Sequence, residues 1–233
     1  FASTHKFVRG FGKRAFIVTS PSFQNGPRAH VLKNLVAQLH SSDVETQVFS
    51  DIEPNPRTTT IDQAGAAARA FRPRYIIALG GGSVMDAAKC VAVLAEQNTT
   101  STSIYDFAYK GPNQPMLKLQ TALPIVCIPT VAATSSETDF YAVVTEWNLH
   151  KKVTLFGAAL QPALSIIDPE LTFSLSPRQT VDGAFDMMTH VLESYFSTRE
   201  PAPLQDRMSE ALVATVVEAL PLVLKNPEHA EAR

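Results

Sequence analysis

Cysteine, net charge and long apolar runs are all scarce in this sequence of 233 residues. The two cysteines, Cys90 and Cys127, are too few for a disulfide framework and fall in segments that we expect to be buried, which fits a reducing compartment. A net charge of -2 gives no electrostatic reason to expect a nucleic-acid partner. No apolar run is long enough to span a bilayer, so no membrane partner is expected. We therefore expect a cytoplasmic globular protein.

One stretch has the features of an anion-binding turn. Residues 75–79 form a short apolar run typical of a strand buried on both faces, and the three glycines at 80–82 follow it. Ser83 is expected to cap a helix over residues 84–96. Glycines let a phosphate approach the backbone, and the free N–H groups of a helix start favour negative charge. Although Met85 replaces the last glycine of the usual dinucleotide fingerprint, the stretch predicts phosphate binding rather than a plain structural turn.

Strand and helix patterns alternate through the first two thirds of the chain. This order predicts a parallel sheet with helices on both faces, whose ligands bind beyond the carboxyl ends of the strands. The loop over residues 129–137 lies at that edge and is rich in hydroxyls, so we interpret it as a second wall of the same site, although alone it would be an ordinary Ser/Thr loop. The expected elements are strands over 15–19, 44–49, 75–79, 123–128 and 164–167, helices over 28–39, 58–71 and 84–96, a polar surface segment over 98–114, and paired strands over 140–145 and 152–156.

From Leu171 onward only helical patterns remain. Ser176 followed by Pro177 predicts a helix start, and the helix should run to about Tyr195 or Phe196. A second helix is expected over 204–224, with Pro221 bending or shortening its end. We place a boundary near Thr172, which divides the chain into an α/β domain over 1–172 and the start of a helical domain over 173–233. The core stripe of the first helix should comprise Val181, Phe185, Met188, Leu192 and Tyr195.

Asp186 and His190 are one helical turn apart, so both side chains can reach one point. A carboxylate and an imidazole placed in this way suit Fe²⁺, Zn²⁺ or a similar ion. The same spacing also occurs in ordinary Asp–His pairs on solvated helix faces, and spacing alone favours that interpretation.

Five motifs, in order, resemble the iron-containing (group III) alcohol dehydrogenases. Ser135 stands where the third motif, at 129–137, usually has glycine. By pattern the chain is most similar to the butanol dehydrogenase, lactaldehyde reductase and aldehyde reductase branches. The motifs are P-N-P at 54–56, G-G-G-S-x-x-D-x-x-K at 80–89, a P-T-x-x-x-T-x-S-E loop at 129–137, I-D-P-E-L at 167–171 and D-x-x-x-H-x-x-E-x-Y at 186–195.

The resemblance implies reversible, metal-dependent hydride transfer between an alcohol, or an aldehyde or ketone, and NAD or NADP. It implies a Rossmann-like nucleotide-binding domain, then the start of an all-α metal-binding domain, usually in a homodimer. Asp186 and His190 would be catalytic metal ligands for Fe²⁺ or Zn²⁺. The implied cofactor-binding residues are Ser20, Asn55, Gly81, Gly82, Ser83, Asp86, Thr130, Thr134 and Lys152.

Two departures from the family pattern affect these expectations. Family members bring two further histidine ligands from later helices, whereas this sequence stops at Arg233 and His229 matches neither. We therefore expect a fragment with weak metal binding and little or no turnover. Many members also carry aspartate after the first strand, where this chain has Ser20. Because that aspartate repels a 2′-phosphate, we expect NADP(H) to be tolerated or preferred here.

Two alternatives stay open from the sequence. The glycerol dehydrogenase and dehydroquinate synthase type shares the architecture but has a different metal-ligand pattern. The second alternative is a homologue that binds a nucleotide without catalysis, and the absence of the two later histidine ligands supports this alternative. Neither the substrate nor the choice between iron and zinc follows from these residues.

Overall fold

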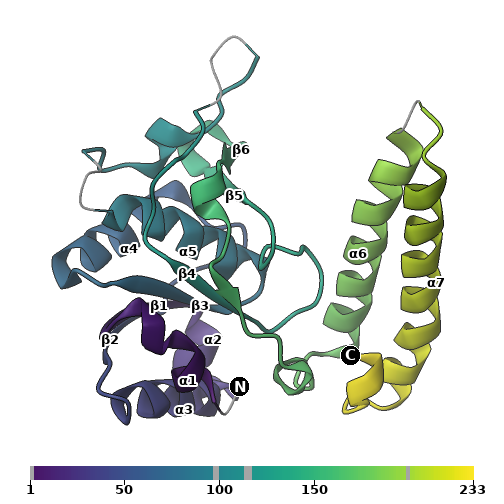
Figure 1. The fold of residues 1–233 in the computed structure, drawn as a ribbon, viewed down its shortest axis with the longest axis horizontal. Coiled ribbons are helices and arrows are strands. Elements are labelled where there is room, and N and C mark those ends of the chain that lie inside the picture. Colours follow the sequence, from purple (N-terminus) through teal and green to yellow (C-terminus); the bar gives the residue numbers. More distant parts are fainter. Residues whose placement is uncertain (1–2, 97–99, 113–116, 198–199) are drawn as a thin grey trace. The chain divides into compact units, whose positions relative to one another are not determined.

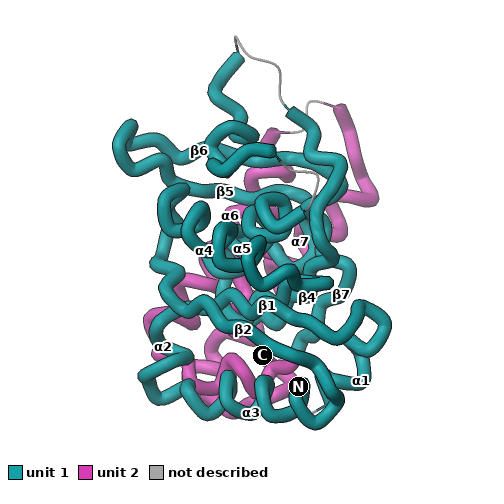
Figure 2. The backbone as a smooth tube through the Cα atoms, turned by 90° about the vertical axis from the view of Figure 1, so that its left-hand side faces the viewer, with its two compact units in different colours: residues 1–129, 136–167 teal, residues 130–135, 168–233 magenta. Residues whose placement is uncertain are grey.

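The structure is a computed structural model that describes residues 3–96, 100–112, 117–197 and 200–233. It contains two compact units (Figure 2). Unit 1 comprises residues 1–129 and 136–167, and unit 2 comprises residues 130–135 and 168–233. The domain boundary expected near Thr172 stays a prediction, and the two units are described separately.

Unit 1 is built on a five-stranded parallel sheet in the order β2-β1-β3-β4-β7. Every residue of β3 and β4 is buried, as is all of β1 after its first residue, because helices cover both faces of the central strands. The predicted parallel α/β sheet is therefore confirmed. Its strands are β1 (Arg14–Thr19), β2 (Glu45–Phe49), β3 (Tyr75–Gly80), β4 (Ile125–Pro129) and β7 (Leu164–Ser165).

The helices of unit 1 flank this sheet, with α4 and α5 on one face and α3 on the other (Figure 1). Helix α4 ends where Arg72 adopts the left-handed conformation (φ 55°) ahead of Pro73, which cannot continue a helix. The helices are α1 (Thr4–Val8), α2 (Pro21–Gln24), α3 (Ala29–His40), α4 (Thr58–Phe71) and α5 (Gly82–Ala95). The polar segment expected over 98–114 lies partly outside the described residues, and its described part includes the 3-10 helix Ile104–Phe107.

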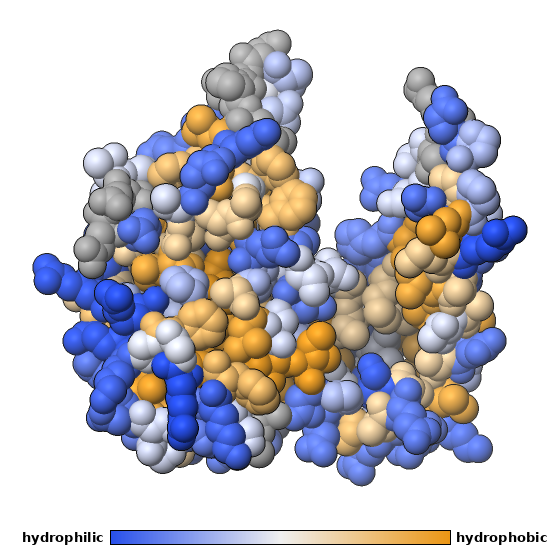
Figure 3. Space-filling model, viewed as in Figure 1, coloured by the Kyte–Doolittle hydropathy of each residue, from blue (hydrophilic) through white to orange (hydrophobic). Residues whose placement is uncertain are grey.

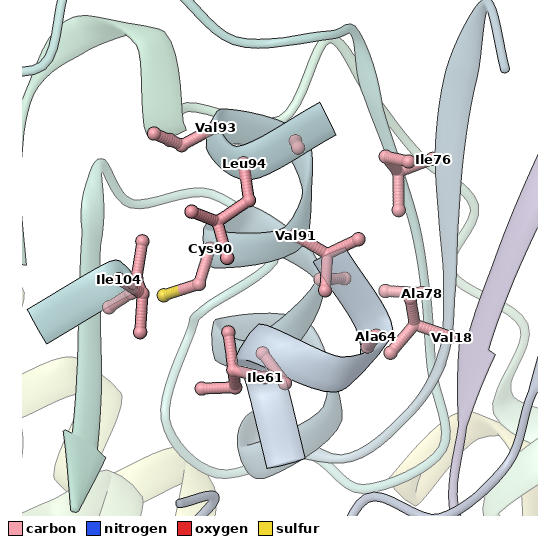
Figure 4. Close-up of a cluster of buried hydrophobic side chains, with 14 of the residues drawn as sticks. Val18, Ile61, Ala64, Ile76, Ala78, Cys90, Val91, Val93, Leu94 and Ile104 are labelled. Carbon is pink, nitrogen blue, oxygen red and sulfur yellow. The ribbon is translucent and has the colours of Figure 1, made fainter. Parts of the chain in front are cut away.

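Helix α5 is the centre of the hydrophobic core (Figure 4). Nearly all its residues after the first turn are buried, and its side chains pack against the sheet, α4 and Ile104. Gly65 allows α4 to approach closely, since a Cβ there would lie 2.6 Å from the Leu94 Cδ1 atom. Both Cys90 and Cys127 are buried and free, as expected.

An antiparallel hairpin of β5 (Tyr141–Glu146) and β6 (Lys151–Phe156) covers part of α5, which confirms the predicted strand pair. Lys89 of α5 is 0% exposed, and its Nζ donates to the Asp139 Oδ1 atom at 2.6 Å and the Asp139 carbonyl at 3.1 Å. It also donates to the Tyr141 carbonyl at 2.8 Å. The lysine of the glycine-rich motif therefore joins α5 to the hairpin.

Unit 2 contains the helix pair α6 (Pro177–Ser197) and α7 (Pro203–Lys225). The Ser176 Oγ atom accepts a hydrogen bond from the Gln179 N–H at 3.2 Å, and the Ser176 N–H donates to Gln179 Oε1 at 3.2 Å. This capping box confirms the helix start predicted at Ser176. Helix α7 continues past Pro221, so the proline does not shorten it. Within the described helices, no segment combines the length and apolarity that crossing a membrane requires.

The core stripe expected on α6 is wrong at Phe185, which is 59% exposed, whereas Gly183 and Ala184 are buried. A Cβ on Gly183 would lie 2.7 Å from the Ala132 carbonyl oxygen, so α6 makes its close approach through its smallest residue. A helical period identifies an apolar face but not the neighbour that covers it. Large apolar side chains also lie exposed on the helix pair (Figure 3), among them Phe196, Leu204, Met208 and Leu212.

We expect Lys89→Met to destabilise unit 1 by about 3 kcal/mol, because it leaves the Asp139 carboxylate and the Tyr141 carbonyl without their buried donor. Urea unfolding followed by the fluorescence of Trp147, the single tryptophan, measures this change. Lys33→Met removes an exposed helical lysine and should shift stability by less than about 0.5 kcal/mol. Equal effects of the two substitutions would contradict the role assigned to Lys89.

Candidate functional site

The order of the strands in unit 1 reverses between β1 and β3. In doubly wound sheets, ligands bind at the carboxyl ends of the strands that flank this switch point. Thr19 pairs with Leu79, and its hydroxyl donates to the Leu79 carbonyl at 2.7 Å, so Ser20 and Gly80 lie at adjacent strand ends. The candidate site of unit 1 is therefore the carboxyl edge of β1 and β3.

The glycine turn (Gly80, Gly81, Gly82) joins β3 to α5. Gly81 occupies the N-cap position of α5. Glycine has no side chain to accept a hydrogen bond from the first backbone N–H groups of the helix, and no other side chain of the described residues accepts one there. The expectation that Ser83 is the N-cap is wrong, because the helix begins at Gly82 and the N-cap position is occupied by Gly81. Ser83 lies in the first turn, where its Oγ atom accepts from the Asn55 N–H at 3.2 Å. A Cβ on Gly80 would lie 2.7 Å from the Val84 Cβ atom, so a larger residue would displace the turn.

The loop that carries Asn55 contacts the hairpin that carries Lys152. Asn55 is exposed and left-handed (φ 53°) in the loop after β2. Lys152 is exposed on β6 and pairs with Thr145, whose N–H donates to the Pro56 carbonyl at 2.8 Å. The hairpin therefore meets the loop that carries Asn55.

Thr130 directly follows β4, whose last residue, Pro129, pairs with Gly80. Thr130 is 1% exposed, and its hydroxyl has no hydrogen-bond partner among the described residues. Such buried hydroxyls normally have partners, so this one fits a polar ligand group. Thr134 is exposed further along the loop. Ser135 has φ 58°, so the loop keeps the left-handed conformation that glycine would adopt more easily.

Asp86 lies one turn into α5, and both its carboxylate oxygens are engaged by the protein. One accepts from the Ser136 hydroxyl at 2.6 Å and the other from the Val143 N–H at 2.8 Å. Burial raises the pKa of Asp86, while the two hydrogen bonds oppose that rise. Direct contact of Asp86 with a cofactor stays a prediction, and the observed contacts anchor the helix that follows the glycine turn.

Ser20 lies in a group of polar side chains after β1, of which the sequence suggested only Ser20 itself. The Arg28 Nη2 atom donates to the Ser22 hydroxyl at 2.8 Å, and the Ser22 and Ser20 hydroxyls are 2.9 Å apart. The Arg28 guanidinium lies over the Phe23 ring, 4.3 Å from its centroid. Burial lowers the pKa of Arg28. The sequence signal, an arginine shortly after a strand end, was too common to single out.

In unit 2, the structure brings the Asp186 and His190 side chains together on α6, with Oδ1 and Nε2 3.8 Å apart and both residues accessible to solvent. An imidazole and a carboxylate are suitable donors for Fe²⁺ or Zn²⁺. Among the described residues, however, no cluster of three or more such side chains could hold an ion. The pair therefore fits part of a metal site, because protein metal sites of this kind use at least three protein ligands.

A doubly wound sheet with an uncapped glycine turn at its switch point defines a nucleotide-binding α/β protein. The sequence model described as iron-containing alcohol dehydrogenase matches residues 1–169, and that of the Fe-containing alcohol dehydrogenase family, C-terminal, matches residues 180–233. The chain belongs to the iron-containing alcohol dehydrogenase family, as the five motifs indicated.

Individual relatives agree with this membership. NADH-dependent butanol dehydrogenase B of Clostridium acetobutylicum is 34% identical over 88% of this chain and 51% of its own length. NADPH-dependent aldehyde reductase YqhD of Escherichia coli is 32% identical over 87% of this chain and 51% of its own length. The structure of NADH-dependent butanol dehydrogenase A from Thermotoga maritima matches 99% of this chain and 56% of its own, with a TM-score of 0.88 and 28% identity. The chain spans about half the length of the curated relatives it matches.

Asp86 makes the stability of unit 1 depend on pH. Because its pKa is raised above the ordinary 3.8, the folded state binds this proton more tightly than the unfolded state. The resulting stabilisation is present below pH 3.8 and is lost as the pH rises through the folded-state pKa. As the pH is lowered from about 6 to about 4, the wild type should therefore become more stable relative to Asp86→Asn. Urea unfolding across that range measures the trend, with Asp51→Asn as an exposed control; the opposite slope would refute it.

We expect the purified 233-residue chain to bind Fe²⁺ and Zn²⁺ weakly, because no cluster of three ligating side chains adds to the Asp186–His190 pair in the described residues. After metal loading and desalting, atomic absorption should find no stoichiometric ion, while His190→Ala should abolish the weak binding seen by titration. Retention of one tightly held ion per chain would show that this expectation is wrong.

Proposed function

We propose that this chain provides the cofactor-binding part and the first metal-binding helix of an NAD(P)-dependent oxidoreductase. The reaction is reversible hydride transfer between a primary or secondary alcohol, or an aldehyde or ketone, and the nicotinamide cofactor. The observation that carries the proposal is the uncapped glycine turn at the switch point of the sheet. A diphosphate is the part of a dinucleotide that this arrangement suits, because it replaces the missing cap.

The residues around the turn have distinct roles in this proposal. The backbone of Gly81, Gly82 and Ser83 binds the diphosphate, since no side chain of the described residues caps the helix there. Asn55 fixes Ser83 through its N–H, and Asp86 holds the helix in place. The unsatisfied Thr130 hydroxyl, with Thr134 further along the loop, hydrogen-bonds the cofactor towards its nicotinamide end. Lys152, near the Asn55 loop, supplies a positive charge for the phosphates or ribose hydroxyls.

On α6, Asp186 and His190 serve as two ligands of a catalytic ion. When bound, Fe²⁺ or Zn²⁺ supplies Lewis acidity that polarises the substrate oxygen, and the nicotinamide supplies the hydride chemistry. The contribution of this chain is to hold a carboxylate and an imidazole one helical turn apart. Further ligands are needed to complete a tight site.

The names of the relatives support a small alcohol or aldehyde as the substrate, since they include a butanol dehydrogenase and an aldehyde reductase. The family match favours this function over the glycerol dehydrogenase and dehydroquinate synthase type and over a non-catalytic homologue. The protein works as a homodimer in this proposal, which light scattering tests. A cytoplasmic location agrees with the two free, buried cysteines. Burial raises the pKa of the Cys127 thiol to about 12, so this thiol is protonated and unreactive at neutral pH.

The glycine turn can be tested with ADP-ribose, which carries the diphosphate but no reactive ring. Gly80→Ala should weaken its binding by about tenfold or more, because the new Cβ displaces Val84 and with it the amides of the turn. Gly10→Ala is the matched control, since a Cβ at Gly10 meets nothing within 4 Å. Calorimetric titration measures both variants. A wild-type chain that does not bind ADP-ribose, or a Gly80→Ala chain that binds it normally, would argue against the proposed function.

A further inference from the structure

The proposed function leaves one polar group at the switch point unexplained. The Arg28 cluster (Ser20, Ser22 and Arg28) is a connected set of donors in which Arg28 contacts Ser22 at 2.8 Å and Ser22 lies 2.9 Å from Ser20. The set directly follows β1, and therefore lies on the same carboxyl edge as the glycine turn.

Within the part of the chain that the structure describes, the positive charge of Arg28 has no carboxylate to balance it. The residue is half-buried, and its guanidinium lies on the apolar Phe23 ring. It forms no ion pair with any carboxylate of the described residues, including Asp51, the acidic residue that follows β2. Partial burial of an unpaired cation is unfavourable, whereas a bound anion would offset the cost.

The position of the cluster indicates which anion it would meet. Neighbouring strands are about 4.8 Å apart, so Ser20 lies one strand spacing from Gly80, where β3 ends. In a dinucleotide resting on the glycine turn, the adenosine ribose is bonded directly to the diphosphate. Its 2′ position can therefore reach the end of β1. In dinucleotide-binding folds, an arginine near this position accommodates a 2′-phosphate, whereas a carboxylate there binds a free 2′-hydroxyl.

We propose that the Arg28 cluster binds the 2′-phosphate of NADP(H), and that Arg28 is the residue that makes this chain prefer the phosphorylated cofactor. The inference rests on the proposed function, since it requires a dinucleotide on the glycine turn. The guanidinium donates two charge-assisted hydrogen bonds to the phosphate, and the Ser20 and Ser22 hydroxyls donate to its remaining oxygens. Sequence alone suggested only that Ser20 removes a repulsion, whereas the structure adds an attractive partner.

The test compares ADP-ribose with 2′-phospho-ADP-ribose by calorimetric titration of the full chain, which needs neither metal nor turnover. The wild type should bind the 2′-phosphorylated ligand at least about tenfold more tightly. Arg28→Leu should weaken that ligand by about 10- to 100-fold and leave ADP-ribose within about twofold, because only the charge-assisted contact is lost. Arg28→Lys should keep part of the preference. Arg74→Leu, an exposed arginine before β3 at the opposite edge of the sheet, should change neither affinity.

A second variant keeps the inference testable if Arg28→Leu does not fold. Ser20→Asp places a carboxylate in the cluster, and should reverse the preference in favour of ADP-ribose. If both ligands bind the wild type equally and Arg28→Leu changes neither, the inference is overturned while the proposed function stands. If neither ligand binds, the proposed function fails as well. If inorganic phosphate binds through Arg28 but the 2′-phosphate adds nothing to nucleotide affinity, the cluster is a site for another anion and the inference is again overturned.

Discussion

The attachment of α5 to the β5–β6 hairpin is the interaction on which the rest of unit 1 depends. Lys89 is wholly buried, and its cost of desolvation is offset by a carboxylate and two carbonyls that accept from its Nζ. One turn earlier, Asp86 binds Ser136 and the Val143 backbone. These two residues fix the helix along its axis and in its rotation. Because the glycine turn is the start of the same helix, they also fix where its free amides point.

The polar groups of unit 1 fall into two kinds. Several inside the structure are satisfied, as Lys89, Asp86 and the Thr19 hydroxyl are, whereas the buried Tyr75 and Thr145 hydroxyls have no partner among the described residues. Those at the carboxyl edge are not: the start of α5 has no side-chain cap, and Arg28 has no counter-charge within the described residues. In unit 2, the buried Thr130 hydroxyl also has no hydrogen-bond partner among the described residues. Because unpartnered polar groups also occur elsewhere in the unit, it is the free start of α5 beside the Arg28 charge, at adjacent strand ends, that supports the proposed anionic ligand.

Periodicity and turn chemistry in the sequence predicted the architecture well. The alternation of apolar strands and helical stripes located all five strands of the sheet, the hairpin and the Ser176 cap, since each is determined by residues close in sequence. What failed depends on contacts in space. With three glycines in a row, the first helical residue could not be read from Ser83. The exposure of Phe185 depends on which surface meets α6. Arg28 gained significance only when its position over Phe23 and its lack of an ion pair were visible.

The proposed cofactor site and the proposed metal site differ in how many of their binding groups are already held in place. The glycine turn begins a helix whose later residues are nearly all buried against the sheet, so in the proposed function its amides need little ordering on binding. The Asp186–His190 pair has no such support in the described residues: both side chains are solvent-accessible, and their only mutual contact is 3.8 Å long. A ligand pair of this kind must be ordered by the ion itself and by further donors. In the proposed function the diphosphate contacts therefore lie in unit 1, so they can be measured and altered independently of the metal.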